Sequence, residues 1–328
     1  MLYELMSGIK TLSVIGMCKN AGKTTVLNSL IRECEEHGEV IGLTSIGRDG
    51  ERSDLVTNTA KPEIFVREGA VVATAERLLR ECAVSREILF STGIPTPMGE
   101  IIVFRARSSG CVQIGGASIT EHQRAVRDLL VSFGCTRVFI DGAISRRSLG
   151  DPSLCDGVVL SSGASYDADI RTTVADTAYI AGLYALPVLP YGELTSRYTA
   201  VSSEGVTTGE DVRSVMPALK SGADMLCLKG ALTDAAAKEL TSCGKLLSGT
   251  LLVAEDASRL LLSLPSYEKL KLLTRGFAVQ RGTRLIAVTV NPFSAYGMHY
   301  EKNEFKERVA AALERANVRV PVMDVKNV

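Results

Sequence analysis

The chain has 328 residues, of which 46% are hydrophobic, so it can bury a large core as one large or two ordinary domains. Its 37 basic and 37 acidic side chains balance, which leaves no net charge to attract nucleic acid or an anionic membrane. Eight cysteines without a C-x-x-C pair and only three histidines give little support for a zinc site or for histidine-based catalysis. We therefore expect no nucleic-acid partner and no membrane partner.

The first residues lack the charged region, the long apolar stretch and the small-residue cleavage site of a secretory signal peptide. No apolar run along the chain reaches the length of a membrane span. We expect the protein to be cytoplasmic.

Apolar, β-branched runs alternate with helix-like patterns, which predicts an α/β fold with a doubly wound, mostly parallel sheet covered on both faces. The predicted strands are residues 11–17, 40–46, 101–106, 137–140, 157–160, 185–189, 225–228, 250–253, 285–290 and 320–324. The predicted helices are residues 23–37, 70–82, 119–133, 168–184, 234–241, 257–264 and 304–316.

The sequence IGMCKNAGKTT, residues 15–25, follows the first predicted strand and opens the first predicted helix. Backbone N–H groups of such a loop surround phosphate oxygens, while Lys23 supplies positive charge and the Thr24 hydroxyl suits Mg²⁺. The usual G-x-x-x-x-G-K-[ST] string has its first glycine where this chain has Met17, and the nearest glycine is Gly16. The segment is thus a variant Walker A motif, or P-loop, and predicts a nucleoside triphosphatase. The expected nucleotide-binding residues are Lys19, Asn20, Ala21, Gly22, Lys23, Thr24 and Thr25.

Lys19 lies inside this loop, four residues before Lys23. It is similar to the second, signature lysine of dimeric ATPases with a deviant Walker A motif, although the spacing is one residue short. Two interpretations of Lys19 remain open: it reaches across a homodimer, or it is a solvated loop lysine. The pair Thr24–Thr25 is common in the SIMIBI class of P-loop proteins, which implies that Thr25 contacts the α-phosphate or caps the helix.

Phosphoryl transfer also needs a carboxylate that holds Mg²⁺ or its water shell. RVFIDGA, residues 137–143, predicts a buried strand with Asp141 at its carboxyl end, the edge where ligands bind in such sheets. A helix cap or a turn would explain Asp141 equally well in isolation, but the P-loop upstream favours a metal role. Arg146 and Arg147 follow in a polar segment that either senses the γ-phosphate or binds an acidic partner, and ordinary surface arginines are the alternative.

The second predicted strand runs into RDGERSD, which contains Asp49 and Asp54. Switch I of related P-loop proteins offers a water-positioning or magnesium-linked aspartate at this place, and Asp49 is the preferred residue. A turn formed by Asp49 and Gly50 is an equal alternative. Residues 48–63 are expected to form a long loop that nucleotide orders. Lys23, Asp49 and Asp141 are the predicted catalytic residues.

The sequence has no N-K-x-D pattern for guanine, so ATP is favoured over GTP. Residues 161–165 and Asn291 are candidates to approach nucleotide or substrate, with tight connections and an Asn-Pro turn as the alternatives. The sequence predicts either a partner-facing patch or ordinary aromatic packing for Phe293, Tyr296 and Tyr300.

Residues 191–221 are polar and rich in Ser, Thr and Gly, which predicts a linker or irregular segment. The expected domains are therefore a P-loop nucleotide-binding domain at 1–190 and a smaller α/β domain at 222–328.

Four segments together resemble a bacterial family: GMCKNAGKTTVLN, FIDGAISRRS, a following D-x-V-[VI]-L-S-S-G-A and the distal VTVNPFSAYG. That family is associated with adenosylcobalamin-dependent lysine and ornithine aminomutases, as their reactivase component. The resemblance covers nearly the whole chain, and the P-loop is its diagnostic motif. It implies an ATPase-type chaperone that releases damaged cobalamin from a client mutase or reloads it. It also implies nucleotide roles for Lys23, Thr24 and Asp141.

Three functions remain open on this basis. The leading hypothesis is a Mg²⁺-dependent nucleoside triphosphatase that acts as a switch or chaperone on a client protein. The second is an ATP-dependent small-molecule kinase or ligase of the dethiobiotin-synthetase type. The third is a nucleotide sensor that binds without hydrolysis.

Overall fold

A computed structural model describes residues 2–47, 63–143 and 150–327. Contacts between Cα atoms divide the chain into two compact units, one formed by residues 1–181 and 284–328 and the other by residues 182–283. This division differs from the expected domains, because residues 284–328 return to the first unit. Residues 191–221, expected as a linker, lie within the second unit and contribute two strands and a helix to it.

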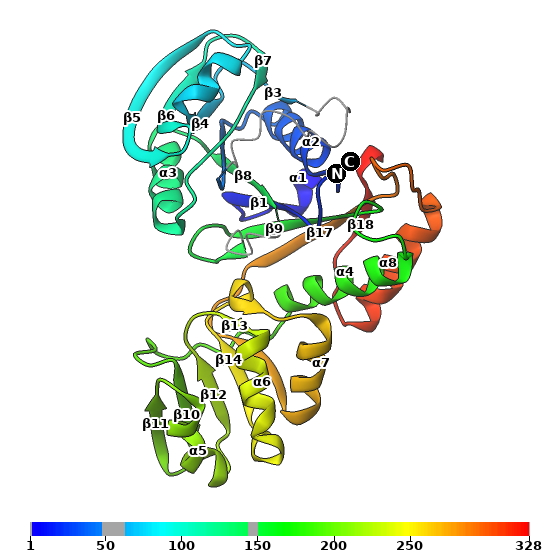
Figure 1. The fold of residues 1–328 in the computed structure, drawn as a ribbon. Helices are drawn as coiled ribbons and strands as arrows, with labels where there is room; N and C mark the ends of the chain where they lie inside the picture. The colour runs from blue at the N-terminus through cyan, green and yellow to red at the C-terminus, as the bar shows by residue number, and fades with distance from the viewer. Residues whose placement is uncertain (1, 48–62, 144–149, 328) are drawn as a thin grey trace. The chain divides into compact units, whose positions relative to one another are not determined.

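The first unit contains a large sheet that confirms the expected α/β fold with mostly parallel strands. Its described residues form nine strands in the order β18-β17-β9-β1-β8-β2-β4-β6-β5 (Figure 1). All neighbours from β18 to β4 are parallel, and the hairpin of β5 and β6 adds antiparallel strands at one edge. The strands are β1 (Thr11–Gly16), β2 (Ile41–Ser45), β4 (Val71–Ala75), β5 (Arg86–Thr96), β6 (Gly99–Ala106), β8 (Arg137–Ala143), β9 (Gly157–Gly163), β17 (Arg284–Asn291) and β18 (Val322–Asp324), and a separate antiparallel pair is β3 (Ile64–Val66) and β7 (Gly110–Val112).

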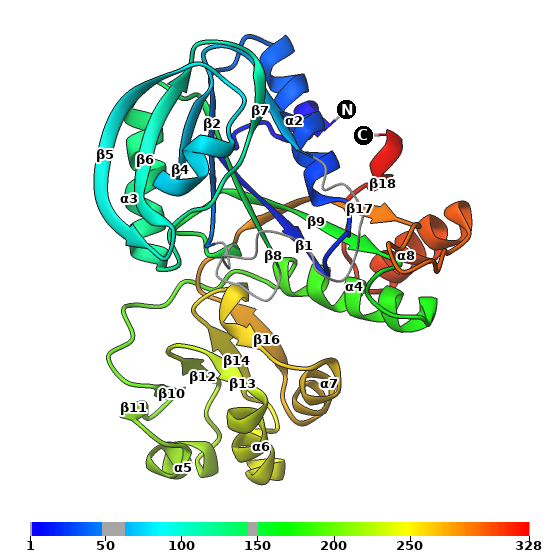
Figure 2. The same cartoon turned by 45° about the horizontal axis from the view of Figure 1, so that its top comes forward.

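Helices cover both faces of this sheet (Figures 1 and 2). The apolar side of α2 joins the core of one face through Leu27, Leu30 and Ile31, while α3 lies on the other face, where the Gln123 amide donates to the Thr44 hydroxyl (3.3 Å). No helix in the described part of the chain has the length and apolar character of a membrane span. The helical segments of this unit are α1 (Leu2–Leu5), α2 (Lys23–Glu36), η1 (Glu76–Glu81), α3 (Thr120–Ser132), α4 (Ile170–Tyr184, which continues into the second unit), α8 (Lys302–Arg315) and η5 (Val325–Asn327).

The second unit is a smaller α/β layer with its own five-stranded sheet, ordered β11-β10-β12-β14-β16. Strands β12, β14 and β16 are parallel, whereas β10 runs antiparallel to both of its neighbours. Its elements are β10 (Tyr198–Ser202), β11 (Gly205–Gly209), α5 (Val212–Lys220), β12 (Met225–Leu228), β13 (Leu232–Thr233), α6 (Asp234–Ser242), η3 (Gly244–Leu247), β14 (Leu251–Ala254), η4 (Ala257–Arg259), β15 (Leu260–Leu261), α7 (Leu264–Leu273) and β16 (Gly276–Val279).

Three predicted elements are wrong. The predicted helix 70–82 is strand β4 followed by the 3-10 turn η1, because β4 is buried along its whole length between β2 and β6. The predicted helix 257–264 is a short 3-10 turn and strand β15. The predicted strand 185–189 contributes only an isolated bridge between Val188 and Val279.

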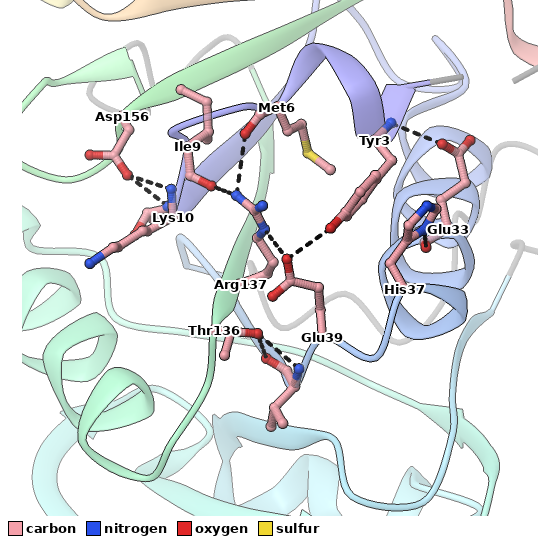
Figure 3. A network of polar contacts seen from close by, with 12 residues as sticks. Tyr3, Met6, Ile9, Lys10, Glu33, His37, Glu39, Thr136, Arg137 and Asp156 are labelled. Atoms are coloured by element: carbon pink, nitrogen blue, oxygen red, sulfur yellow. Dashed lines mark hydrogen bonds and ion pairs between the residues drawn. The ribbon is translucent and has the colours of Figure 1, made fainter.

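A polar network closes the amino ends of the strands in the first unit (Figure 3). Arg137 at the start of β8 pairs with Glu39 (3.0 Å) and donates to the carbonyls of Met6 and Ile9. The Tyr3 hydroxyl also donates to Glu39 (3.2 Å). Burial favours a higher pKa for Glu39, but hydrogen bonds from Thr136, Arg137 and Tyr3 and the charge of Arg137 outweigh it, so the pKa is lowered.

Candidate functional site

The predicted phosphate loop connects the carboxyl end of β1 to the first turn of α2. Strand β1 lies between β8 and β9 and is parallel to both (Figure 2). The Met17 N–H donates to the Ser161 carbonyl of β9 (2.9 Å), so the loop begins as an extension of the sheet. Asn20 and Gly22 have left-handed backbones, with φ of 62° and 92°, which turn the chain into the helix.

The N-terminus of α2 suits an anion. Gly22 is its N-cap residue and supplies no side-chain hydrogen bond, and the first turn contains no acidic residue. The first backbone N–H groups of a helix lack partners within the helix, and the helix dipole places partial positive charge there. A phosphate group is the kind of ligand that this helix end can bind.

Lys23 folds back over the start of the loop. A Cβ atom at position 16 would lie 2.7 Å from both Cγ and Cδ of Lys23 and 3.0 Å from its Nζ. Gly16 therefore leaves the space that the lysine side chain occupies, and any larger residue would displace it. The sequence revealed Gly16 only as a departure from the usual spacing, whereas the structure shows that it accommodates Lys23.

Residues distant in sequence support the back of the loop. The Asn291 side chain, at the end of β17, donates to the Asn20 carbonyl (2.8 Å). A Cβ atom on Gly163 of β9 would lie 3.2 Å from the Ala21 Cα, and one on Gly22 would lie 2.6 Å from Cγ1 of Val325. Gly163 belongs to the 161–165 segment that the sequence marks as a candidate, but no local pattern indicates its contact with the loop, and Val325 belongs to no recognised motif.

Below the loop, buried hydroxyl groups hold β9 and α4 together. Thr177 approaches Ser162 (2.7 Å), and its hydroxyl also contacts the sulfur of Met17 (3.1 Å). Ser161 accepts a hydrogen bond from Thr289 of β17 (2.9 Å). These two serines of the 161–165 segment are fully buried, so their side chains are used inside the fold.

The loop residues differ in accessibility. Lys19 and Thr25 are exposed, whereas Lys23 and Thr24 are half-buried. Burial raises the pKa of the Cys18 thiol to about 11, and the charge of Lys23 opposes that rise. The thiol therefore stays protonated at neutral pH, which makes it a poor nucleophile and a poor metal ligand.

Asp141 lies on β8, the strand beside β1. It is opposite Val14 on one side and Ser45 of β2 on the other, and its carbonyl accepts from the Ile46 N–H (3.1 Å). The strand continues for two residues beyond it, so Asp141 lies slightly inside the sheet rather than at its last position. The structure thus places Asp141 on β8, which pairs with β1, the strand that leads into the loop.

Several candidates lie outside the described residues. These are Asp49 and Asp54, in 48–62, and Arg146 and Arg147, in 144–149. The residues that follow the first of these segments are held against α2, since Asn28 donates to the Glu63 carbonyl (2.8 Å) and accepts from the Phe65 N–H (3.1 Å).

The loop that follows β17 carries the predicted aromatic residues. Phe293 and Tyr296 are exposed, and Lys326 lies over the Phe293 ring at 4.3 Å. Tyr300 is instead tied inward, because its hydroxyl hydrogen-bonds Thr173 (2.8 Å) and donates to the Asp167 carbonyl. Only two of the three aromatic residues are thus available on the surface.

Comparison with known proteins identified nothing similar to this chain. No protein-family model, no curated protein and no solved structure matches the chain.

Proposed function

We propose that the chain is a Mg²⁺-dependent nucleoside triphosphatase whose phosphate site is the loop at residues 16–25. The observation that carries the proposal is the fold of Lys23 over Gly16, at the uncapped N-terminus of α2. A lysine, the first N–H groups of a helix and a neighbouring threonine form the donor set that triphosphate binding requires.

The same residues fit a nucleotide with its metal. Lys23 and the first N–H groups of α2 would hold the phosphates, and the Thr24 hydroxyl and the Asp141 carboxylate would hold Mg²⁺. When bound, Mg²⁺ neutralises charge on the phosphate oxygens. Asp49 is proposed to orient the attacking water, and ATP is the preferred nucleotide over GTP.

Steady-state phosphate release from Mg-ATP and Mg-GTP tests this proposal. We expect turnover by the natural protein and its loss in Lys23→Ala and in Asp141→Asn. The matched control is Lys10→Ala, since Lys10 is an exposed lysine at the opposite end of β1. Unchanged turnover in a folded Lys23→Ala variant would show that the loop is not the site.

We further propose that hydrolysis serves as a switch or chaperone for a client protein, with an adenosylcobalamin-dependent aminomutase as the first candidate. The support is the sequence resemblance. Phosphate release that rises on addition of the mutase would favour this role, whereas ADP formation that depends on a metabolite would favour a kinase or ligase. Tight nucleotide binding without hydrolysis in any condition would favour a sensor.

Lys19 offers a test of dimer formation. It is exposed in the loop, as a residue that reaches a second copy would be. If it acts in a homodimer, Lys19→Ala should lower turnover without weakening nucleotide binding, and activity should rise with protein concentration. A solvated lysine would leave both turnover and its concentration dependence unchanged.

A further inference from the structure

The residues between β17 and α8 form a tight hairpin. Phe293 and His299 face each other as an antiparallel bridge, and the Ser294 N–H donates to the Met298 carbonyl (2.9 Å). The rings of Phe293 and His299 also meet edge to face, with their centres 5.4 Å apart. Backbone and ring contacts thus fix the shape of this segment, the 292–300 hairpin.

One end of the hairpin is attached to the phosphate loop directly. The side-chain amide of Asn291, the residue before the hairpin, donates to the Asn20 carbonyl (2.8 Å). Asn20 has a left-handed backbone with a φ of 62°, a conformation that is uncommon for residues other than glycine. The N–H of Ala21 belongs to the same peptide as this carbonyl. The hydrogen bond from Asn291 therefore also sets the direction of a loop N–H group.

The other end of the hairpin reaches the start of the loop through α4. The Tyr300 hydroxyl donates to the Asp167 carbonyl, so the Thr173 hydroxyl donates to the Tyr300 oxygen (2.8 Å). One turn further along α4, the Thr177 hydroxyl contacts the Thr173 carbonyl (2.6 Å) and the sulfur of Met17 (3.1 Å). Both threonines are fully buried. A continuous series of contacts, the Tyr300–Met17 connection, thus ends at the residue that replaces the usual first glycine of the motif.

The hairpin therefore holds the phosphate loop at two positions, Met17 at its start and Asn20 in its middle. All of these residues belong to the first unit. The tip of the hairpin is exposed, with 55% of Tyr296 and 41% of Met298 accessible to solvent. Exposed side chains lose little packing when they move, so a change in the loop backbone can shift the tip at small cost.

We infer that the 292–300 hairpin responds to occupancy of the phosphate loop, with Thr177 and Tyr300 as positioning residues for that loop. The inference rests on the proposed function, in which the loop binds the phosphates of a nucleotide. Phosphates bound by loop N–H groups act on the backbone between Met17 and Asn20, and the two attachments carry the displacement to the hairpin. By linkage, weakening an attachment changes the affinity of the loop. The proposed switch thereby acquires an exposed surface whose arrangement depends on nucleotide.

A single tryptophan at the tip tests this inference, because the natural chain contains none. Tyr296→Trp places the fluorescent reporter on the hairpin, and Phe90→Trp places the control on β5, an exposed strand at the edge of the sheet. Mg-ATP would be titrated into both full-length proteins, with its affinity measured in parallel by calorimetry. We expect a saturable fluorescence change in Tyr296→Trp at the calorimetric Kd, and no change in Phe90→Trp.

Further variants in the Tyr296→Trp protein test the Tyr300–Met17 connection. Thr177→Val removes the hydroxyl at nearly constant volume and should weaken Mg-ATP binding about fivefold, as loss of a hydrogen bond does. It should also reduce the fluorescence change at saturating Mg-ATP, and Thr177→Ser should restore both. Tyr300→Phe breaks the connection at its far end and decides the test if Thr177→Val does not fold. Tyr166→Phe is the matched control, since it removes a hydroxyl that donates to Asp176 on the same helix (2.7 Å).

The two measurements separate failure of the inference from failure of the proposed function. Calorimetric binding with a silent Tyr296→Trp reporter would overturn the inference alone. A full fluorescence change and unaltered affinity in both Thr177→Val and Tyr300→Phe would do the same, because the hairpin would then contact the nucleotide without the connection. Absence of calorimetric binding by the natural protein would overturn the proposed function and the inference with it.

Discussion

At the amino ends of the strands in the first unit, charged side chains bind one another and the backbone. Arg137, Glu39 and Tyr3 form a connected group that also fixes the carbonyls of Met6 and Ile9 (Figure 3). At the carboxyl end of the neighbouring strand β1, Lys23 folds back over Gly16, and Gly22, the N-cap residue of α2, provides no side-chain cap. At the amino ends, the charged groups already bind partners within the protein, and these contacts stabilise the fold. At the carboxyl end of β1, the lysine and the helix N-terminus supply donors that suit an anion. Substitutions at the two ends should therefore have separate effects.

The largest effect is expected at the amino ends. Arg137→Leu leaves Glu39 half-enclosed without its charge partner and also removes donors from two carbonyls. We expect the free energy of unfolding to fall by about 3 kcal/mol, the scale of breaking a buried ion pair. Urea denaturation would measure it, with the exposed Arg319→Leu as the matched control. A loss no larger than that of the control would contradict the stabilising role.

The second prediction concerns the opposite end. In Gly16→Ala, the added Cβ would collide with the Lys23 side chain and move its ammonium group away from the loop. We expect Mg-ATP affinity to fall about 30-fold, equivalent to about 2 kcal/mol, with little change in unfolding. Gly192→Ala is the control, since no atom lies near a Cβ at that position. Calorimetric titration would measure both variants, and equal affinities would show that Lys23 does not depend on Gly16.

A smaller effect is expected from the support behind the loop. Asn291→Ala removes the hydrogen bond to the Asn20 carbonyl, which should cost about 1 kcal/mol in the free energy of unfolding. Nucleotide affinity should fall less than in Gly16→Ala, because the lysine itself stays in place. Asn303→Ala, an exposed asparagine on α8, is the comparison in both measurements. An affinity loss equal to that of Gly16→Ala would mean that Asn291 contacts the nucleotide directly.

The smallest effect is a pH dependence at the amino ends. The pKa of Glu39 is lower in the folded state than in the unfolded chain, so its ionised form stabilises the protein above the unfolded pKa. That contribution is lost as pH falls through the folded pKa. Unfolding measured from pH 7 into this acidic range should therefore show a difference between the natural protein and Glu39→Gln that shrinks with acid. A constant difference would contradict the assignment.

Local patterns in the sequence were sufficient for most of the parallel sheet. The strand that ends at Gly16 and the helix that begins at Lys23 are found where an apolar run meets the loop motif. Residues 70–82 were misread because Ala, Leu, Arg and Glu favour a helix, while burial between two strands decides for β4. Strand β5 is absent from the predicted strands. It contains Gly93 and Pro95, which are unfavourable inside a central strand but are tolerated at the edge of a sheet, where β5 lies.

The missing parts of the fold and site depend on contacts between distant residues. The return of residues 284–328 follows from the pairing of β17 with β9, which no local pattern reveals. The support that Gly163 and Val325 give to the loop has the same origin. The sequence could identify Lys23 by its motif, but the space that Gly16 leaves for it appears only once the side chain is placed.

The most direct test of the central claim is equilibrium binding of Mg-ATP and Mg-GTP to Lys23→Ala, beside the natural protein and Lys10→Ala. We predict binding by the natural protein and by Lys10→Ala, with ATP preferred. Lys23→Ala should lose about 100-fold in affinity or more while its unfolding curve stays the same, because it removes a charge from the loop and little from the core. A folded Lys23→Ala variant that binds nucleotide as well as the natural protein, or a natural protein that binds neither nucleotide, would contradict the account.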